Sequence, residues 1–162
     1  MIRKAHTADL PTITDIYNQA IIARYCTGDT VCVSTEERLK WFDSHNTERT
    51  PIFVYEIDGT VIAFGYISHY RPGRQAFKCV GEVSYYVDFN YHAKGIGKQL
   101  LQFLILEAKK KDYTHLIAIL LDCNTKSITL LEKNGFSMWG KMPNIARIDE
   151  NIYSHLYYGL SL

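Results

Sequence analysis

The sequence predicts a mixed α/β domain built on one central sheet. Three strand-like segments follow one another between residues 52 and 88, and the hairpin signal Asp58-Gly59 joins the first two. Helix and strand then alternate, at residues 95–111, 115–121, 125–134 and 152–160. This order is typical of a mixed α/β domain. The length of 162 residues, without repeat or linker, fits one domain over residues 1–162.

A short strand and two helices are expected in the first 45 residues. Residues 2–5 form the strand, and apolar side chains spaced by three and four predict a helix over residues 7–23. Pro11 suits the first turn of that helix, where a missing N–H costs little. The capping box formed by Ser34 and Glu37 opens a second helix that runs to about residue 44.

The middle of the chain predicts strands over residues 52–57, 60–70 and 79–88, with a loop at residues 71–74. The apolar stripe over residues 95–111 is the clearest helix signal. The continuous apolar run 115–121 predicts a strand buried on both faces. Residues 125–134 read as a short helix that Gly135 ends, and residues 152–160 alternate weakly as a last strand.

The charge balance and the cysteines exclude several kinds of function. The net charge is +1, from 18 basic and 17 acidic residues, which argues against nucleic-acid binding. The four cysteines form no CxxC pair, so no metal is expected and the thiols are read as reduced. The sequence shows no apolar leader or membrane-length run, and we expect a cytoplasmic protein without membrane contact.

The segment from Val87 to Lys98 joins a predicted strand to the strongest helix. Gly95 and Gly97 remove side chains where the backbone must approach a ligand closely. The first N–H groups of a helix have no internal acceptor, and the helix dipole makes that end favourable for anions. The segment therefore predicts a pyrophosphate cradle.

A glycine pair before a helix is also common without any ligand, and two nucleotide motifs compete with this interpretation. The dinucleotide motif GxGxxG is incomplete, because Lys98, Gln99 and Leu100 follow Gly97. The Walker pattern fails as well, because no Gly-Lys-Ser/Thr follows the first glycine.

A second motif makes the interpretation of the cradle more specific. It begins at the end of the strand 115–121 and comprises Asn124, Ser127, Leu130, Lys133, Gly135 and Phe136. Together with the cradle it resembles the GCN5-related N-acetyltransferase (GNAT) superfamily, whose members carry Gln/Arg-x-x-Gly-x-Gly/Ala and Asn-x-x-Ser-x-x-Leu-x-x-Lys-x-Gly-Phe. The chain looks most similar to the phosphinothricin and methionine-sulfone acetyltransferase group, on residues 15–18 and 82–87.

The resemblance implies a GNAT fold: a twisted, mostly antiparallel sheet of about seven strands, splayed at strands 4 and 5 and flanked by about four helices. It also implies acetyl-CoA as co-substrate. The residues that would bind it are Tyr85, Tyr86, Val87, Ala93, Lys94, Gly95, Ile96, Gly97, Lys98, Asn124, Ser127 and Lys133.

Glu82 matches the position of a carboxylate that serves as general base in the resembled group. The chemistry needs one, because an α-amine with a pKa of about 8 is mostly ammonium at neutral pH and only the neutral amine attacks a thioester. A carboxylate accepts that proton directly or through water. Strand alternation predicts that Glu82, Ser84 and Tyr86 share one face.

Two positions depart from the family pattern. Leu131 stands where many members have a tyrosine that protonates the departing thiolate, so Tyr85, Tyr86 and His155 are only guesses for a general acid. A thiolate leaves without strong acid help, since the pKa of a thiol is about 8.5. His92 replaces the usual Gln or Arg, and a loop histidine bonded to backbone is the favoured interpretation.

The acceptor pocket is implied near the first two helices and the loop 70–77, where Arg71 and Arg74 could bind a carboxylate and Phe77 could form a wall. The resemblance thus predicts acetylation of the primary amine of a small amino-acid-like acceptor, such as phosphinothricin or methionine sulfone. The alternatives are a peptide or protein N-terminal amine and a non-catalytic acyl-CoA sensor. The resemblance also implies a homodimer.

Overall fold

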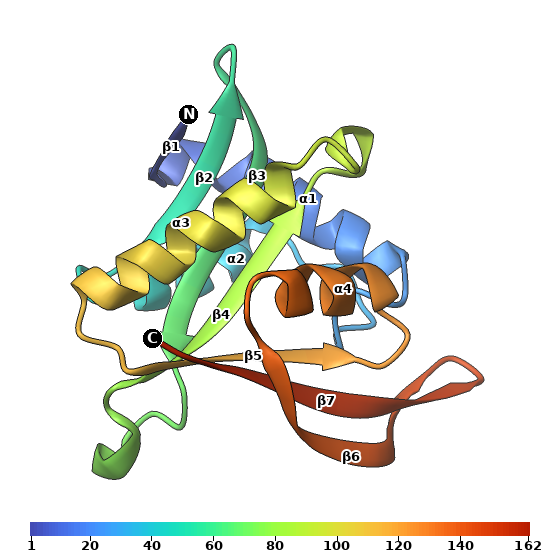
Figure 1. Ribbon diagram of the computed structural model, residues 1–162. Coiled ribbons are helices and arrows are strands. Elements are labelled where there is room, and N and C mark those ends of the chain that lie inside the picture. The colour runs from blue at the N-terminus through green and yellow to red at the C-terminus, as the bar shows by residue number, and fades with distance from the viewer.

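A computed structural model describes all residues, 1–162, and contains one seven-stranded sheet with the order β1-β2-β3-β4-β5-β7-β6 (Figure 1). The strands are β1 (Ile2–Lys4), β2 (Ile52–Ile57), β3 (Thr60–His69), β4 (Val80–Val87), β5 (His115–Leu121), β6 (Ser137–Ile148) and β7 (Asn151–Ser161). The helices are α1 (Leu10–Ile22), α2 (Thr35–His45), α3 (Ile96–Lys110) and α4 (Thr125–Lys133). The expected fold class is confirmed.

Every neighbouring pair of strands is antiparallel except β4 and β5, which run parallel. Their pairing covers only Val80, Gly81 and Glu82 on β4, opposite residues 115–117 on β5. Beyond Glu82 the two strands diverge, as Figure 1 shows. Backbone groups of β4 that face this gap therefore have no strand partner and are available to a ligand.

The residue pattern predicts a single last strand at residues 152–160 and no strand at residues 137–148, where the structure contains β6. In the structure β6 is twelve residues long and pairs with β7 along the edge of the sheet. The sequence pattern does not indicate this strand, because two register irregularities, at Met138/Gly140 and Met142/Ala146, break the alternation of side chains between the two faces of the sheet. Pro143 lies in the second irregularity, a position compatible with an edge strand.

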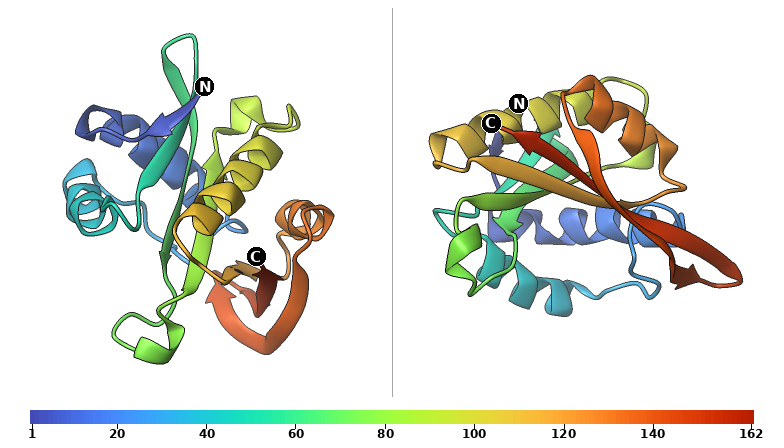
Figure 2. Two further views of the ribbon diagram at one scale, coloured as in Figure 1. Left: turned by 60° about the vertical axis from the view of Figure 1, so that its left-hand side comes forward. Right: turned by 60° about the horizontal axis from the view of Figure 1, so that its bottom comes forward.

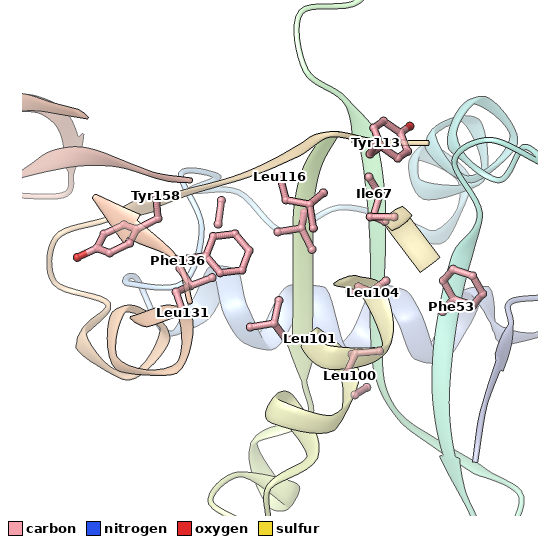
Figure 3. Close-up of a cluster of buried hydrophobic side chains, with 14 of the residues drawn as sticks. Phe53, Ile67, Leu100, Leu101, Leu104, Tyr113, Leu116, Leu131, Phe136 and Tyr158 are labelled. Atoms are coloured by element: carbon pink, nitrogen blue, oxygen red, sulfur yellow. The ribbon is translucent and has the colours of Figure 1, made fainter. Parts of the chain in front are cut away.

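Helices cover the two faces of the sheet in pairs. The helices α3 and α4 pack on one face and α1 and α2 on the other (Figure 2). The core on the α3 side includes Ile67, Leu100, Leu101, Leu104, Leu116, Leu131 and Phe136 (Figure 3). The core on the α1 side includes Ile13, Ile16, Tyr17, Phe42, Val54 and Phe64. None of the helices is both long and apolar enough to cross a membrane.

Leu104 provides a test of the α3-side core. Its side chain is fully buried, whereas Leu106 on the same helix is 58% exposed. We expect Leu104→Ala to lower the free energy of unfolding by about 2–5 kcal/mol, because it removes buried apolar contacts and leaves a cavity. Leu106→Ala is the matched control, expected within about 0.5 kcal/mol of the wild type. Urea unfolding measures both; equal effects would contradict the packing described.

Candidate active site

A cavity of about 600 Å³ lies where the divergence of β4 and β5 meets the N-terminal ends of α3 and α4. The loop that follows α1 closes one side with Tyr25 and Cys26. From the predicted cofactor set, the cavity is lined by Tyr85, Tyr86, Val87, Ala93, Gly95, Ile96, Gly97, Lys98, Asn124 and Ser127. These residues come from distant parts of the sequence and meet in one space.

The N-terminus of α3 is shaped to receive an anion. Gly95 is the N-cap with φ +79°, Ala93 has φ +60°, and no side chain caps the helix. The N–H groups of Ile96, Gly97 and Lys98 precede the first intrahelical hydrogen bond, which Gln99 donates to the Gly95 carbonyl. These donors and the helix dipole favour a phosphate here, with the Lys98 side chain adding positive charge.

His92 lies in the loop between β4 and α3, and its Nε2 is 2.9 Å from the Val87 carbonyl oxygen. Its ring also packs against Phe89, with 4.5 Å between the ring centroids. The interpretation of His92 as a loop histidine bonded to backbone agrees with this geometry. The bond ties the cradle to the end of β4.

Asn124 positions the start of α4. Its side-chain Oδ1 accepts a hydrogen bond from the Ser127 N–H at 3.3 Å, and the residue is only 6% exposed. The use of Oδ1 as a helix cap leaves the amide N–H₂ group of Asn124 free to donate toward the cavity it lines.

The gap between β4 and β5 holds a second, smaller cavity of about 50 Å³. Ser84 and Tyr85 line it from β4, and residues 118–120 line it from β5. The Tyr85 hydroxyl is buried without a hydrogen-bond partner. Burial raises its pKa to about 12, while the nearby Ser127 hydroxyl acts in the opposite direction. At neutral pH this hydroxyl is protonated, and from its position near Ser127 it can donate a hydrogen bond to a bound ligand.

Glu82 lies at the last residue pair that β4 shares with β5 and lines neither cavity. It pairs with Ser68 of β3, and Ser84 pairs with Tyr66, so these four side chains share one face. Tyr66 and Tyr86 pack against the α1-side core, which places this face toward α1 and α2. Burial raises the pKa of the Glu82 carboxyl above its ordinary value.

Several predicted site residues lie outside both cavities. Lys94 instead donates to the Asn90 carbonyl at 3.1 Å, and Lys133 is exposed in the last turn of α4. Arg71, Arg74 and Phe77 belong to the exposed loop between β3 and β4, where Phe77 packs edge-on against Tyr70. His155 lies on β7, opposite Leu121, and lines neither cavity.

Leu131, the departure from the family tyrosine, belongs to the core. It is 1% exposed and lies beside Phe136 in the cluster of Figure 3. Its side chain also borders the smaller cavity. This position thus provides an apolar wall and no proton donor.

Three residues near the site had no signal in the sequence. Tyr25 and Cys26 follow α1 without a recognisable motif, and only the fold brings them to the cavity. Burial raises the pKa of the Cys26 thiol to about 11, so the group is protonated at neutral pH. Arg38 of α2 lies against the aromatic side chains on the Glu82 side of the sheet.

The fold and the cavity define a class of protein. A sheet that opens between two parallel strands, next to an uncapped helix N-terminus, offers strand-edge groups to an amide-bearing arm and N–H donors to a pyrophosphate. Acetyl-CoA carries both, and the lining residues fit it. This is the arrangement of an acetyl-CoA-dependent N-acetyltransferase.

The comparisons with known proteins agree. Residues 13–136 match the Acetyltransferase (GNAT) family, and the chain belongs to that family. It is 35% identical over 161 residues to YwnH of Bacillus subtilis (strain 168), named as a candidate phosphinothricin acetyltransferase, covering 99% of this chain and 98% of that protein.

Two further matches point the same way. The L-methionine sulfoximine/L-methionine sulfone acetyltransferase of Pseudomonas paraeruginosa is 33% identical over 90% of this chain and 85% of its own length. A candidate acetyltransferase from Salmonella typhimurium, yncA, solved with its cofactor acetyl-CoA, is 29% identical with a TM-score of 0.94, covering 100% of this chain and 93% of that one. The chain is thus a GNAT N-acetyltransferase related to amino-acid acetyltransferases.

Proposed function

We propose that the chain acetylates the primary amine of a small amino-acid-like acceptor, such as methionine sulfone or phosphinothricin, with Glu82 as general base. The observation that carries the proposal is the position of Glu82. It lies where β4 and β5 begin to separate, two residues before Ser84 in the gap. The acetyltransferases named for methionine sulfone and phosphinothricin support the acceptor class.

Different lining residues bind different parts of acetyl-CoA. The N–H groups at the start of α3 and Lys98 hold the pyrophosphate, and Asn124 and Ser127 contact the pantetheine arm from α4. Backbone groups of residues 83–87 that face the gap pair with the amides of that arm. Lys94 and Lys133 do not line the cavity, so the lining does not support their predicted contacts with acetyl-CoA.

Acetyl-CoA supplies an acyl thioester when it is bound. Glu82 accepts the proton of the acceptor ammonium group, directly or through water, so that the amine is neutral when it attacks. A β4 backbone N–H in the gap stabilises the developing negative charge on the carbonyl oxygen. Tyr85 donates a hydrogen bond to the departing thiolate in this proposal, because its buried hydroxyl lies near Ser127 and both residues line the two cavities.

A panel of amines tests the acceptor class. We expect kcat/KM to be highest for methionine sulfone, phosphinothricin or another free amino acid, and much lower for a peptide with a free N-terminus. The reverse order would support peptide acetylation. Binding of acetyl-CoA without turnover on any amine would support a sensor.

We further propose that the chain works as a homodimer through the β6–β7 hairpin. The hairpin projects from the edge of the sheet (Figure 2) and carries five exposed large apolar side chains: Met138, Trp139, Met142, Ile145 and Ile152. Large exposed apolar areas on a protein surface often mark an interaction site. A second copy of the chain, related by two-fold symmetry, would cover it.

The double variant Met142→Asp/Ile145→Asp tests the dimer. Placing two charges on this surface is expected to shift the mass measured by light scattering from that of two chains to that of one. Leu106→Asp, at an exposed site on α3, is the control and should leave the mass unchanged. A wild-type chain that is monomeric at all concentrations would contradict the proposal.

A further inference from the structure

Arg38 of α2 is a buried cation without a partner. The residue is 7% exposed, and its Nε and Nη2 are buried without any hydrogen bond. It takes part in none of the ion pairs in the structure. Burying a charge is costly unless the charge is paired, so an orphaned guanidinium of this kind calls for a ligand.

Three aromatic rings lie close to the guanidinium group of Arg38. Its carbon is 3.6 Å from the centroid of the Trp41 ring, 4.0 Å from that of Tyr17 and 5.9 Å from that of Phe64. These cation–π contacts use none of the guanidinium N–H donors in a hydrogen bond. Nη1 makes no hydrogen bond either, so the guanidinium has no hydrogen-bond acceptor within the chain.

No acidic side chain forms an ion pair with Arg38. Asp29 acts on the charge of Arg38, but its carboxylate accepts a hydrogen bond from the Tyr17 hydroxyl at 2.5 Å and none from Arg38. The other side chains that act on its charge are the tyrosines Tyr17, Tyr66 and Tyr86. No group of this chain fills the role of counter-ion.

Arg38 belongs to the same side of the sheet as Glu82. Tyr66 shares a face with Glu82, and the charges of both Arg38 and Glu82 act on its hydroxyl. Tyr66 also packs against Trp41, with 5.1 Å between ring centroids. Arg38 and Glu82 therefore both lie near Tyr66, on the side of the sheet that faces α1 and α2.

We propose that Arg38 binds the carboxylate of the acceptor and so positions its amine toward Glu82. A carboxylate matches a guanidinium edge with two parallel hydrogen bonds, and an α-amino acid carries its amine on the adjacent carbon. Arg38 would then be the residue that makes the enzyme select amino acids over simple amines. The inference rests on the proposed function, since it takes an amino acid as acceptor.

The test compares Arg38→Met with the wild type on two acceptors, L-methionine sulfone and the same molecule without its carboxyl group. Loss of a charged hydrogen-bond pair is expected to raise KM for methionine sulfone about 10- to 150-fold. The constants for the decarboxylated amine should stay within about threefold of the wild type, which also shows that the variant folds. Arg38→Lys should recover little, because an ammonium cannot bind bidentately.

Lys40→Met, at an exposed site on the same helix, is the matched control. Equal losses on both acceptors would show that Arg38 is structural. A selective loss in Arg74→Met but not in Arg38→Met would assign the carboxylate to the loop arginine instead. Either result would overturn the Arg38 proposal and leave the proposed function intact.

Calorimetric titration of methionine sulfone in the presence of CoA separates binding from turnover. If the wild type binds the amino acid and Arg38→Met does not, but no amine is acetylated, the proposed function fails and only the binding of the carboxylate by Arg38 stands. If the wild type binds and acetylates neither methionine sulfone nor phosphinothricin, both fail.

Discussion

Glu82→Gln is expected to lower kcat by about 100-fold or more, with little change in KM for acetyl-CoA. Glutamine keeps the shape of the side chain but cannot accept the proton of the ammonium group. Glu82 lines neither cavity, so the binding of acetyl-CoA should be preserved. Glu150→Gln, at an exposed site, is the matched control and should retain full activity.

The pH profile gives a second readout of the same residue. Burial raises the pKa of Glu82, and only the ionised carboxylate is a base. Activity should therefore fall as the pH drops through that raised pKa, above the ordinary value of about 4.3. The glutamine variant should lose this acid limb and keep the limb set by the acceptor ammonium. If kcat of Glu82→Gln equalled that of the wild type at every pH, Glu82 would not be the base.

Gly97→Val is expected to weaken acetyl-CoA binding most strongly among single changes in the cradle. A Cβ at Gly97 would lie 3.4 Å from Leu130 Cδ2 and 3.8 Å from Val87 Cγ2, so alanine fits with ordinary contacts. The added methyl groups of valine would enter the cavity that Leu130 and Val87 line. If the steric overlap costs about 1–3 kcal/mol of binding free energy, KM for acetyl-CoA should rise roughly 5- to 150-fold.

Two controls isolate this effect. Gly97→Ala should stay close to the wild type, and Gln102→Val places the same side chain on the exposed face of α3. Fluorescence or calorimetric titration with CoA measures the loss independently of catalysis. Unchanged affinity in Gly97→Val would show that the cofactor does not pass between α3 and α4.

Much of the fold could be predicted because its strongest elements are local. The stripe over residues 95–111 gave α3, observed at Ile96–Lys110, and the capping box at Ser34 gave the start of α2. The strand β6 could not be predicted, because its irregular register removes the alternation on which strand recognition depends.

Some of the site residues could also be predicted from local sequence motifs, and others could not. The cradle and Asn124 are short motifs whose spacing specifies a helix start, so the sequence alone predicts them, and the structure places both at the start of a helix beside one cavity. Arg38 left no such signal, because its aromatic neighbours Tyr17, Trp41 and Phe64 come from α1, α2 and β3 and meet only in the folded chain. The loop arginines Arg71 and Arg74 are the sequence candidates for carboxylate binding, but they are solvent-exposed, whereas Arg38 is buried; none of the three lines either cavity.

The central claim is that this chain transfers an acetyl group from acetyl-CoA to an amino-acid amine. The most direct measurement follows thiol release from acetyl-CoA with methionine sulfone, together with mass spectrometry of the acceptor. We predict one free thiol for each N-acetylated acceptor, with the rate dependent on both substrates and about 100-fold lower in Glu82→Gln. Binding of acetyl-CoA without thiol release, on this acceptor and on every other amine of the panel, would contradict it.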